Sequence, residues 1–320
     1  MLRIKQMDEH FYFWKQPGAR LSIHGPDAAA FLQGQFSNDL RRGVGSVTYG
    51  LWLNHKGKVL ADSFVLRRGE NHFEVVGLTS EPGVIAGRLD AFIIADDVTV
   101  EDAGSSAEML SIAGPGAAGA LEQLGFAVPA EGMFIDAHGA CVFRGRLAGR
   151  TDCWHVLGDH TSAGAVREKL KMTANTSNAR QVGKVTMDRL RILDGVPEIP
   201  ADVGPNDLPQ EGALESEGLS FTKGCYLGQE VMARLHNLGK VRRRLFVVRF
   251  DNPGGLVGTG TSLHLGARKL GEIRGCAPDG DESTVALAML ATHGLKPGDS
   301  LRTETGGIVK IVCLAEGRAW

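Results

Sequence analysis

Alternating polar and apolar positions mark several short strands in the first third of the chain. Residues 19–24 alternate in this way, and Gly-Pro-Asp at residues 25–27 then predicts a helix start, because proline in the first turn loses no hydrogen bond. Residues 47–53 and 59–67 read as two strands joined by a loop with the glycine that hairpins favour. A further strand is predicted at residues 72–78. The N-terminal part is therefore predicted to be a small α+β unit.

The same local pattern occurs a second time. Ile-x-Gly-Pro-x-Ala-Ala-x-x-Leu stands at residues 23–32 and recurs at residues 112–121, 89 positions later (23 to 112). One interpretation is coincidence, since Gly-Pro corners are frequent. The other is two related α+β units side by side with a cleft between them, and such clefts are preferred ligand sites.

Residues 186–217 combine a predicted helix with a long irregular stretch. Thr186 is predicted to cap the helix, which ends at Gly195. Met187 lies on its apolar face, where it either packs in the core, as methionine at this spacing more often does, or lines a cofactor pocket. Residues 200–217 contain three prolines and no clear periodicity. Loops of this length inside a compact domain are functional or disordered, and we favour function because this one leads into the motif described below.

Short strands separated by Gly/Pro turns continue from residue 241 to the end, which predicts a small β-barrel. The predicted fold class is therefore α+β, with an α+β region at residues 1–240 and a barrel at residues 241–320. The α+β region is divided into units at roughly 1–105 and 106–240.

Composition narrows the class of protein. The chain of 320 residues is 43% hydrophobic and 22% charged, with a net charge of −2, so no global field attracts nucleic acid. No segment approaches 18 apolar residues and no signal-peptide pattern is visible, so we expect neither a membrane-spanning segment nor secretion. The five cysteines lack C-x-x-C spacing, which argues against a disulfide framework and against a metal site held by this chain alone. Reduced thiols in the cytoplasm are the simplest interpretation.

The chemistry is predicted to centre on Phe-Thr-Lys-Gly-Cys-Tyr-Leu-Gly-Gln-Glu at residues 221–230. Between Lys223 and Glu230 this stretch places an amine, a thiol, a phenol, an amide and a carboxylate within eight residues. A helical pattern follows it, so Cys225 is expected beside Lys223 and close to a helix N-terminus, and both features favour the thiolate. The alternatives are a surface turn that happens to contain a cysteine, or an inert buried cysteine.

Lys-Gly-Cys-Tyr-x-Gly-Gln-Glu, followed by Ala233-Arg234, resembles the signature of the YgfZ-type folate-binding proteins, which belong to the superfamily of the glycine-cleavage T-protein (aminomethyltransferase). The resemblance covers most of the chain. It implies two α+β units and a barrel around a central cavity that holds tetrahydrofolate or a one-carbon derivative. It also implies an accessory role in assembly or repair of iron–sulfur clusters, with client or assembly proteins as partners.

The resemblance also implies the site residues. Cys225 becomes the candidate catalytic residue, and the candidate cofactor-binding residues are Glu211, Lys223, Cys225, Tyr226, Gln229, Arg234 and Met187. Pro209-Gln210-Glu211 matches the segment whose glutamate binds the pterin in T-protein relatives. A carboxylate accepts two adjacent N–H donors of a pterin in a fork. The alternative for Glu211 is a solvated loop acid.

One departure bears on enzyme activity. Val84 stands where T-proteins carry their catalytic aspartate, and valine cannot act as an acid or base. The protein is therefore expected not to transfer aminomethyl groups, and we lean against an enzyme. Two alternatives remain, namely a folate-dependent one-carbon transferase or demethylase with another substrate, and a folate-binding module without catalysis.

Overall fold

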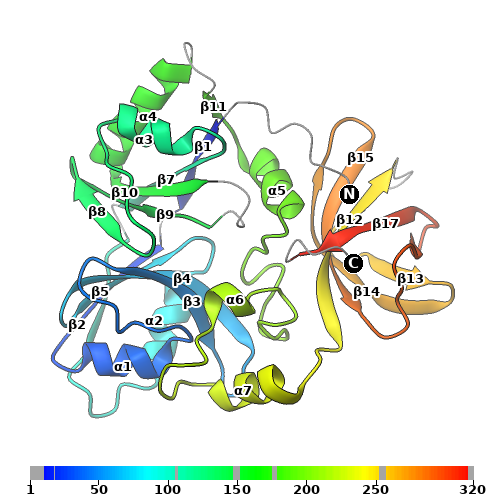
Figure 1. Ribbon diagram of the computed structural model, residues 1–320, viewed down its shortest axis with the longest axis horizontal. Coiled ribbons are helices and arrows are strands. Elements are labelled where there is room, and N and C mark those ends of the chain that lie inside the picture. The colour runs from blue at the N-terminus through cyan, green and yellow to red at the C-terminus, as the bar shows by residue number, and fades with distance from the viewer. Residues whose placement is uncertain are drawn as a thin grey trace.

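The computed structural model describes residues 11–17, 19–104, 107–146, 152–174, 179–251 and 257–315. Two sheets lie face to face with helices on their outer sides, and a barrel stands beside them (Figure 1). The predicted α+β fold with a C-terminal barrel is confirmed.

The first sheet has five strands in the order β3-β4-β5-β2-β6. Its strands and covering helices are β2 (Ala19–His24), α1 (Ala28–Gln35), β3 (Val47–Leu53), β4 (Val59–Gly69), β5 (His72–Gly77), α2 (Pro82–Asp90) and β6 (Thr99–Asp102). Leu32 of α1 and Leu89 of α2 are buried against Val65 and Val75 on one face of the sheet. The predicted hairpin is present, with β3 and β4 paired antiparallel.

The second sheet has six strands in the order β11-β1-β7-β10-β9-β8. Its elements are β1 (Phe11–Pro17), β7 (Ala107–Ala113), α3 (Ala117–Gln123), β8 (Phe134–Ala137), β9 (Ala140–Arg144), β10 (Cys153–Asp159), α4 (His160–Ala174) and β11 (Ala179–Gln181). The division of the sequence at residue 105 put β1 with the first unit, whereas β1 pairs with β7 of the second. The reason is burial, because Phe11 and Phe13 pack in the core under α3 and α4.

The repeated sequence pattern corresponds to a repeated structure. β2 leads into α1 and β7 into α3 through the same corner, where Gly25 has φ +135° and Gly114 has φ +124°. Only glycine takes such angles without strain. A Cβ on Gly25 would also collide with the carbonyl of Asp97. The Gly-Pro corners are therefore structural requirements of both units.

The inner faces of the two sheets pack against each other. Phe64 and Leu66 of β4 meet Phe143 of β9 and Leu157 of β10 in an apolar layer between the sheets. Side chains alternate between the two faces of a strand, so even-numbered residues of β4 point into this layer and odd-numbered ones toward the helices. The layer becomes polar toward one edge, and the candidate site lies there.

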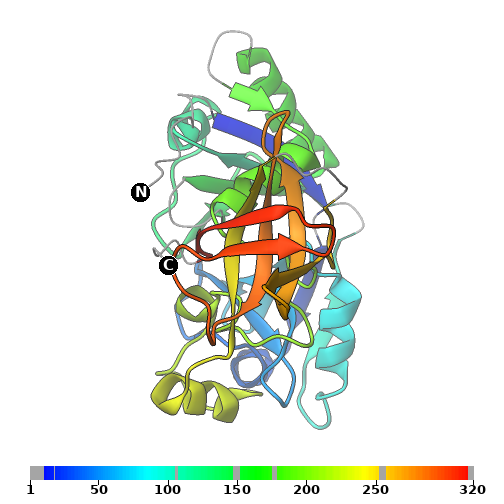
Figure 2. The same cartoon turned by 90° about the vertical axis from the view of Figure 1, so that its right-hand side faces the viewer.

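The barrel is closed, with the strand order β12-β15-β14-β13-β16-β17 (Figure 2). Its strands are β12 (Arg243–Asp251), β13 (Ser262–Leu265), β14 (Arg268–Pro278), β15 (Ser283–Ala291), β16 (Ser300–Thr303) and β17 (Ile308–Leu314). Apolar residues such as Phe246, Ile273 and Leu290 fill its interior.

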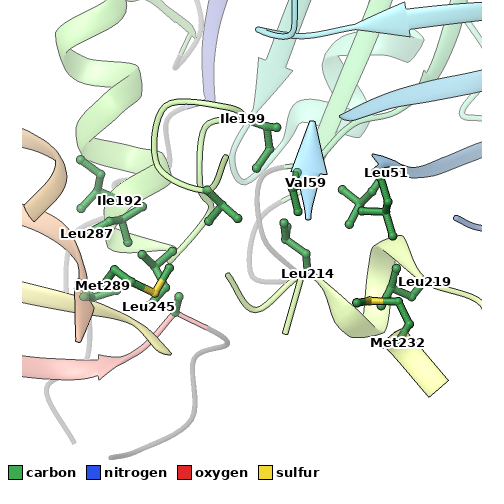
Figure 3. Close-up of a cluster of buried hydrophobic side chains, with 14 of the residues drawn as sticks. Leu51, Val59, Ile192, Ile199, Leu214, Leu219, Met232, Leu245, Leu287 and Met289 are labelled. Atoms are coloured by element: carbon green, nitrogen blue, oxygen red, sulfur yellow. The ribbon is translucent and has the colours of Figure 1, made fainter. Parts of the chain in front are cut away.

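The segment between second sheet and barrel carries α5 (Lys184–Leu193), α6 (Glu215–Gly218) and α7 (Gln229–Leu238). One buried cluster unites it with its neighbours, as Figure 3 shows: Val59 of β4, Ile192 of α5, Met232 of α7 and Leu287 of β15 all belong to it. The predicted cap at Thr186 is wrong, because α5 begins two residues earlier and its N-cap is Gly183. The predicted turn at Gly195 is present, with φ +75°.

Candidate ligand cavity and cysteine loop

A central cavity of about 360 Å³ opens where the two sheets and α5 meet. Its lining comes from β1, β4, the turn before α2, the end of the second sheet, α5 and the loop after α5. Trp14 and Met187 supply an apolar wall. Asp62, Arg146 and His155 supply polar groups. The cavity therefore combines apolar surface with a few converging polar side chains, which is the usual character of a small-molecule site.

Asp62 is a buried acidic side chain in the lining of this cavity. It lies on β4, its exposed fraction is 3%, and its side chain points between the sheets. Ser80 Oγ donates to Asp62 Oδ1 at 2.8 Å and Tyr49 Oη donates to Asp62 Oδ2 at 3.0 Å. Ser80 Oγ also accepts the backbone N–H of Asp62, which fixes the hydroxyl in place. Burial raises the pKa of Asp62, although Arg146 and the two hydroxyl donors oppose the rise.

His155 and Gln16 face the same cavity from the second sheet. His155 is 1% exposed, and its Nδ1 lies 2.7 Å from the Ser111 hydroxyl. Burial lowers the pKa of His155 to about 3, so the imidazole is neutral near pH 7. Nε2 of His155 and Oε1 of Gln16 are buried and have no hydrogen-bond partner among the described residues. Buried polar atoms are normally paired, so these two are free to meet a ligand.

Arg146 separates the central cavity from a second cavity of about 520 Å³ and lines both. Its guanidinium lies 4.5 Å from the ring centre of Tyr49, and its Nε donates to Glu217 at 2.6 Å. Arg146 thereby braces the tyrosine that holds Asp62.

Glu211 lies at the junction between the body and the barrel rather than in the cavity lining. Arg243 of β12 donates to both of its carboxylate oxygens, at 3.1 and 3.0 Å, and Leu208 N–H donates to it at 2.9 Å. The backbone oxygen of Glu211 accepts from Leu245 N–H. The two carboxylate oxygens that the family resemblance assigned to a pterin thus accept from an arginine of the same chain.

Lys223 is buried and anchors the cysteine loop to the first unit. Its Nζ donates to the carbonyl oxygens of Gln33, Phe36 and Asn38, at 2.7, 2.6 and 2.9 Å. These carbonyls lie at the end of α1 and just beyond it, where a cation is favoured by the helix dipole. Burial lowers the pKa of Lys223 to about 8, so the amine still carries its third proton near pH 7. The three hydrogen bonds of this ammonium therefore go to carbonyls of the first unit.

Cys225 is exposed on the loop that Lys223 secures. Leu227 N–H donates to the carbonyl of Gly34, and Gly228, with φ +88°, packs against the turn at Asn54 and Gly57. The loop is therefore pinned on both sides of the cysteine while its thiol faces outward. In Figure 1, α7, which follows this loop, lies at the lower edge of the first unit, away from α5.

The remaining predicted site residues are scattered. Tyr226 belongs to the same buried cluster as Val59 and Ile192, its hydroxyl has no partner among the described residues, and burial raises its pKa to about 12. Gln229 is the first residue of α7 and Arg234 is exposed on the same helix. Of the predicted set, Met187 alone appears in the lining of the central cavity, and its exposed fraction is 8%.

Lys223→Met is expected to lower the free energy of unfolding by about 2–3 kcal/mol, because three carbonyls lose their donor while the apolar stem is kept. Urea unfolding would measure it. Lys56→Met, an exposed lysine in the hairpin beside the loop, is the control and should change little. Faster thiol labelling at Cys225 in the Lys223 variant would show that the loop has loosened. An unchanged free energy of unfolding and an unchanged labelling rate would contradict the role of Lys223 in anchoring the loop.

The family resemblance placed the expected carboxylate at position 84, which is Val84 in this chain, and the sequence analysis did not identify Asp62. Val84 lies on α2 with 45% of its surface exposed, outside the central cavity lining. The signal for Asp62 was present, since it is a charged residue inside the apolar strand Val59–Gly69 at a position that alternation directs away from the helices. His155 and Ser111 are similar polar positions in β10 and β7.

Within the described part of the chain, no helix is long and apolar enough to cross a membrane. Among the same residues, no group of three or more His, Cys, Asp or Glu side chains is arranged to hold a metal ion.

Comparison with known proteins identifies the family. The family model described as the GCVT N-terminal domain matches residues 16–216. The human protein named iron–sulfur cluster assembly factor IBA57, mitochondrial, is 30% identical over 319 residues, covering 91% of this chain and 80% of that protein. The protein of Colwellia psychrerythraea named tRNA-modifying protein YgfZ is 26% identical over 315 residues, covering 96% and 93%.

A solved structure supports the same fold. The glycine cleavage system aminomethyltransferase T from Bartonella henselae matches with a TM-score of 0.78 at 19% identity, covering 97% of this chain and 88% of that one. At that identity the likeness concerns the fold alone. Together with the matched domain and relatives, it completes the assignment: the chain belongs to the glycine-cleavage T-protein superfamily and, within it, to the YgfZ/IBA57 type.

Proposed function

We propose that this protein binds a tetrahydrofolate and supports the assembly or repair of iron–sulfur clusters in client proteins. The observation that carries the proposal is the exposed Cys225 on a loop pinned by Lys223 and by the hairpin of the first unit. An outward thiol on a fixed loop suits a reaction with a partner. The human relative carries the name of an iron–sulfur cluster assembly factor.

The central cavity is the proposed folate site. Its volume of about 360 Å³ lies within the usual range for ligand pockets. The unpaired Nε2 of His155 and Oε1 of Gln16 fit a ligand with polar ring edges, and Trp14 and Met187 fit its flat apolar faces. Folate binding also fits the family, which is folate-related. Bound folate would supply one-carbon or redox chemistry, while these side chains bind and orient it and keep water away from it.

Cys225 is proposed to supply one ligand to a cluster shared with a partner. Iron–sulfur clusters usually require four protein ligands, and a single thiolate provides one. Clustered His, Cys, Asp and Glu side chains that could complete such a site are not found among the described residues. The other ligands would therefore come from the client or assembly protein. Lys223, Tyr226, Gln229 and Arg234 are proposed to shape this loop and its helix.

The cytoplasm is the proposed compartment, because the cysteines of the described residues form no disulfide, as a reducing compartment favours. The human relative is named as mitochondrial, and the mitochondrial matrix would satisfy the same chemistry.

A folate-dependent one-carbon transferase is the second candidate function. The observation that favours it is Asp62, which provides the cavity with a carboxyl group despite Val84. Formation of a one-carbon product from a tetrahydrofolate derivative would distinguish this candidate from the first.

The test of the proposed function uses the full chain in a strain that lacks its own YgfZ-type protein. We expect the wild-type chain to restore iron–sulfur enzyme activity there, and the purified protein to bind tetrahydrofolate in equilibrium titrations. Restored activity without folate binding would remove the folate part of the proposal. Folate binding without restored activity would remove the iron–sulfur part.

A further inference from the structure

The lining of the central cavity contains three carboxylates that differ in how they are paired. Asp188 and Glu198 accept hydrogen bonds from the cationic side chain of Lys184, and Arg191 pairs with both. Asp62 is different, because its recorded side-chain donors are the neutral hydroxyls of Tyr49 and Ser80. Asp62 is also the most buried of the three. Its negative charge is therefore the least neutralised by direct contacts in the cavity.

Asp62 retains capacity for further hydrogen bonds. Each carboxylate oxygen offers two acceptor positions, and each oxygen of Asp62 uses one with a side-chain hydroxyl. The two remaining positions can accept two adjacent N–H donors from one ligand edge, as carboxylates do with a guanidinium. A reduced pterin carries such an edge, formed by its ring N3–H and its 2-amino group.

We infer that Asp62 is the residue that recognises the pterin ring, by accepting its N3–H and 2-amino donors. The inference rests on the proposed binding of folate in the central cavity and names the recognition residue there. Tyr49 and Ser80 are positioning residues, since both hydroxyls fix the plane of the carboxylate. Arg146 over the Tyr49 ring and the Asp62 N–H to Ser80 bond hold these two in turn.

The rest of the cavity complements such a ring. Nε2 of His155 is buried without a partner and can donate to or accept from the ring, according to its tautomer. Oε1 of Gln16 adds an acceptor. The competing carboxylate, Glu211, is outside the cavity lining and already meets Arg243 with both oxygens. Among the three carboxylates of the cavity lining, Asp62 is the most buried, and Asp188 and Glu198 are each paired with Lys184 and Arg191.

The experiment compares pterin with lumazine, which carries oxygen in place of the 2-amino group. Both rings fluoresce, so quenching titrations give their dissociation constants with the same full-length protein. Wild-type protein is expected to bind pterin about 10- to 100-fold more tightly than lumazine, the range for one charge-assisted hydrogen bond. Asp62→Asn should abolish that preference, since an amide presents its own donor to the amino group. Asp136→Asn, an exposed aspartate of the second unit, should keep it.

Further variants separate recognition from stability. Ser80→Ala and Tyr49→Phe each remove one hydroxyl that orients Asp62, and each should weaken pterin binding more than lumazine binding, even if Asp62→Asn fails to fold. A wild-type preference that survives in Asp62→Asn, or in both positioning variants if that protein does not fold, would overturn the inference while leaving folate binding intact. Wild-type protein that binds neither tetrahydrofolate nor pterin would instead overturn the proposed folate function.

Discussion

Cys225→Ser is expected to abolish the ability of the chain to restore iron–sulfur enzyme activity, while tetrahydrofolate affinity stays at the wild-type value. Serine keeps the size and loop geometry of cysteine but is a poor ligand for iron. The thiol lies on an exposed loop, and Cys225 is absent from the lining of the central cavity, so folate binding has no reason to change. Activity in the deficient strain and equilibrium titration of the purified variant measure the two halves of this prediction.

Cys276→Ser is the matched control, because Cys276 is a half-buried barrel residue whose thiol lies near the carbonyl of Val257. It should restore activity as the wild type does. Thiol labelling of the native protein adds a second check. Cys225 should react far faster than Cys141 and Cys153, since burial raises the pKa of both buried thiols to about 12. Full activity of Cys225→Ser would show that the cysteine is structural and that the cavity alone carries the function.

Local signals predicted much of the fold. The Gly-Pro corners before α1 and α3 need backbone angles that glycine favours, so the sequence repeat had a structural cause. Turn density likewise predicted the barrel. The position of β1 could not be predicted in this way, because its partner β7 lies about a hundred residues away and alternation does not identify a partner. The start of α5 at Lys184 was missed because its N-cap, Gly183, makes no side-chain hydrogen bond.

The cysteine loop was predicted better than the cavity. Short-range spacing was enough to single out Cys225, which the structure places on the surface. It could not show where the amine of Lys223 points, since its acceptors lie some 190 residues earlier in the chain. Asp62, Ser111 and His155 converge only because two sheets pack face to face. Each appeared in the sequence as one polar residue in an apolar strand, and alternation alone does not show that these strands share a cavity.

Glu211→Ala is expected to lower the free energy of unfolding by about 3–4 kcal/mol. The variant leaves the guanidinium of Arg243 without a carboxylate that met two of its nitrogens, and it leaves the partly buried N–H of Leu208 without an acceptor. Arg243 also meets Asp207 and is partly exposed to water. The contact with Asp207 and the exposure to water both moderate the loss of stability, so the value falls in the lower part of the range for breaking a buried ion pair.

Urea unfolding of Glu211→Ala should be compared with that of Glu282→Ala, an exposed glutamate of the barrel that should change stability little. Tetrahydrofolate affinity, measured where the variant is fully folded, separates the two roles of Glu211. If Glu211 only holds the junction, the variant protein loses stability and keeps its tetrahydrofolate affinity, because the cavity lining is intact. Wild-type stability with weakened folate binding would instead support the pterin contact that the sequence comparison predicted, and would require Glu211 to release Arg243 when folate binds.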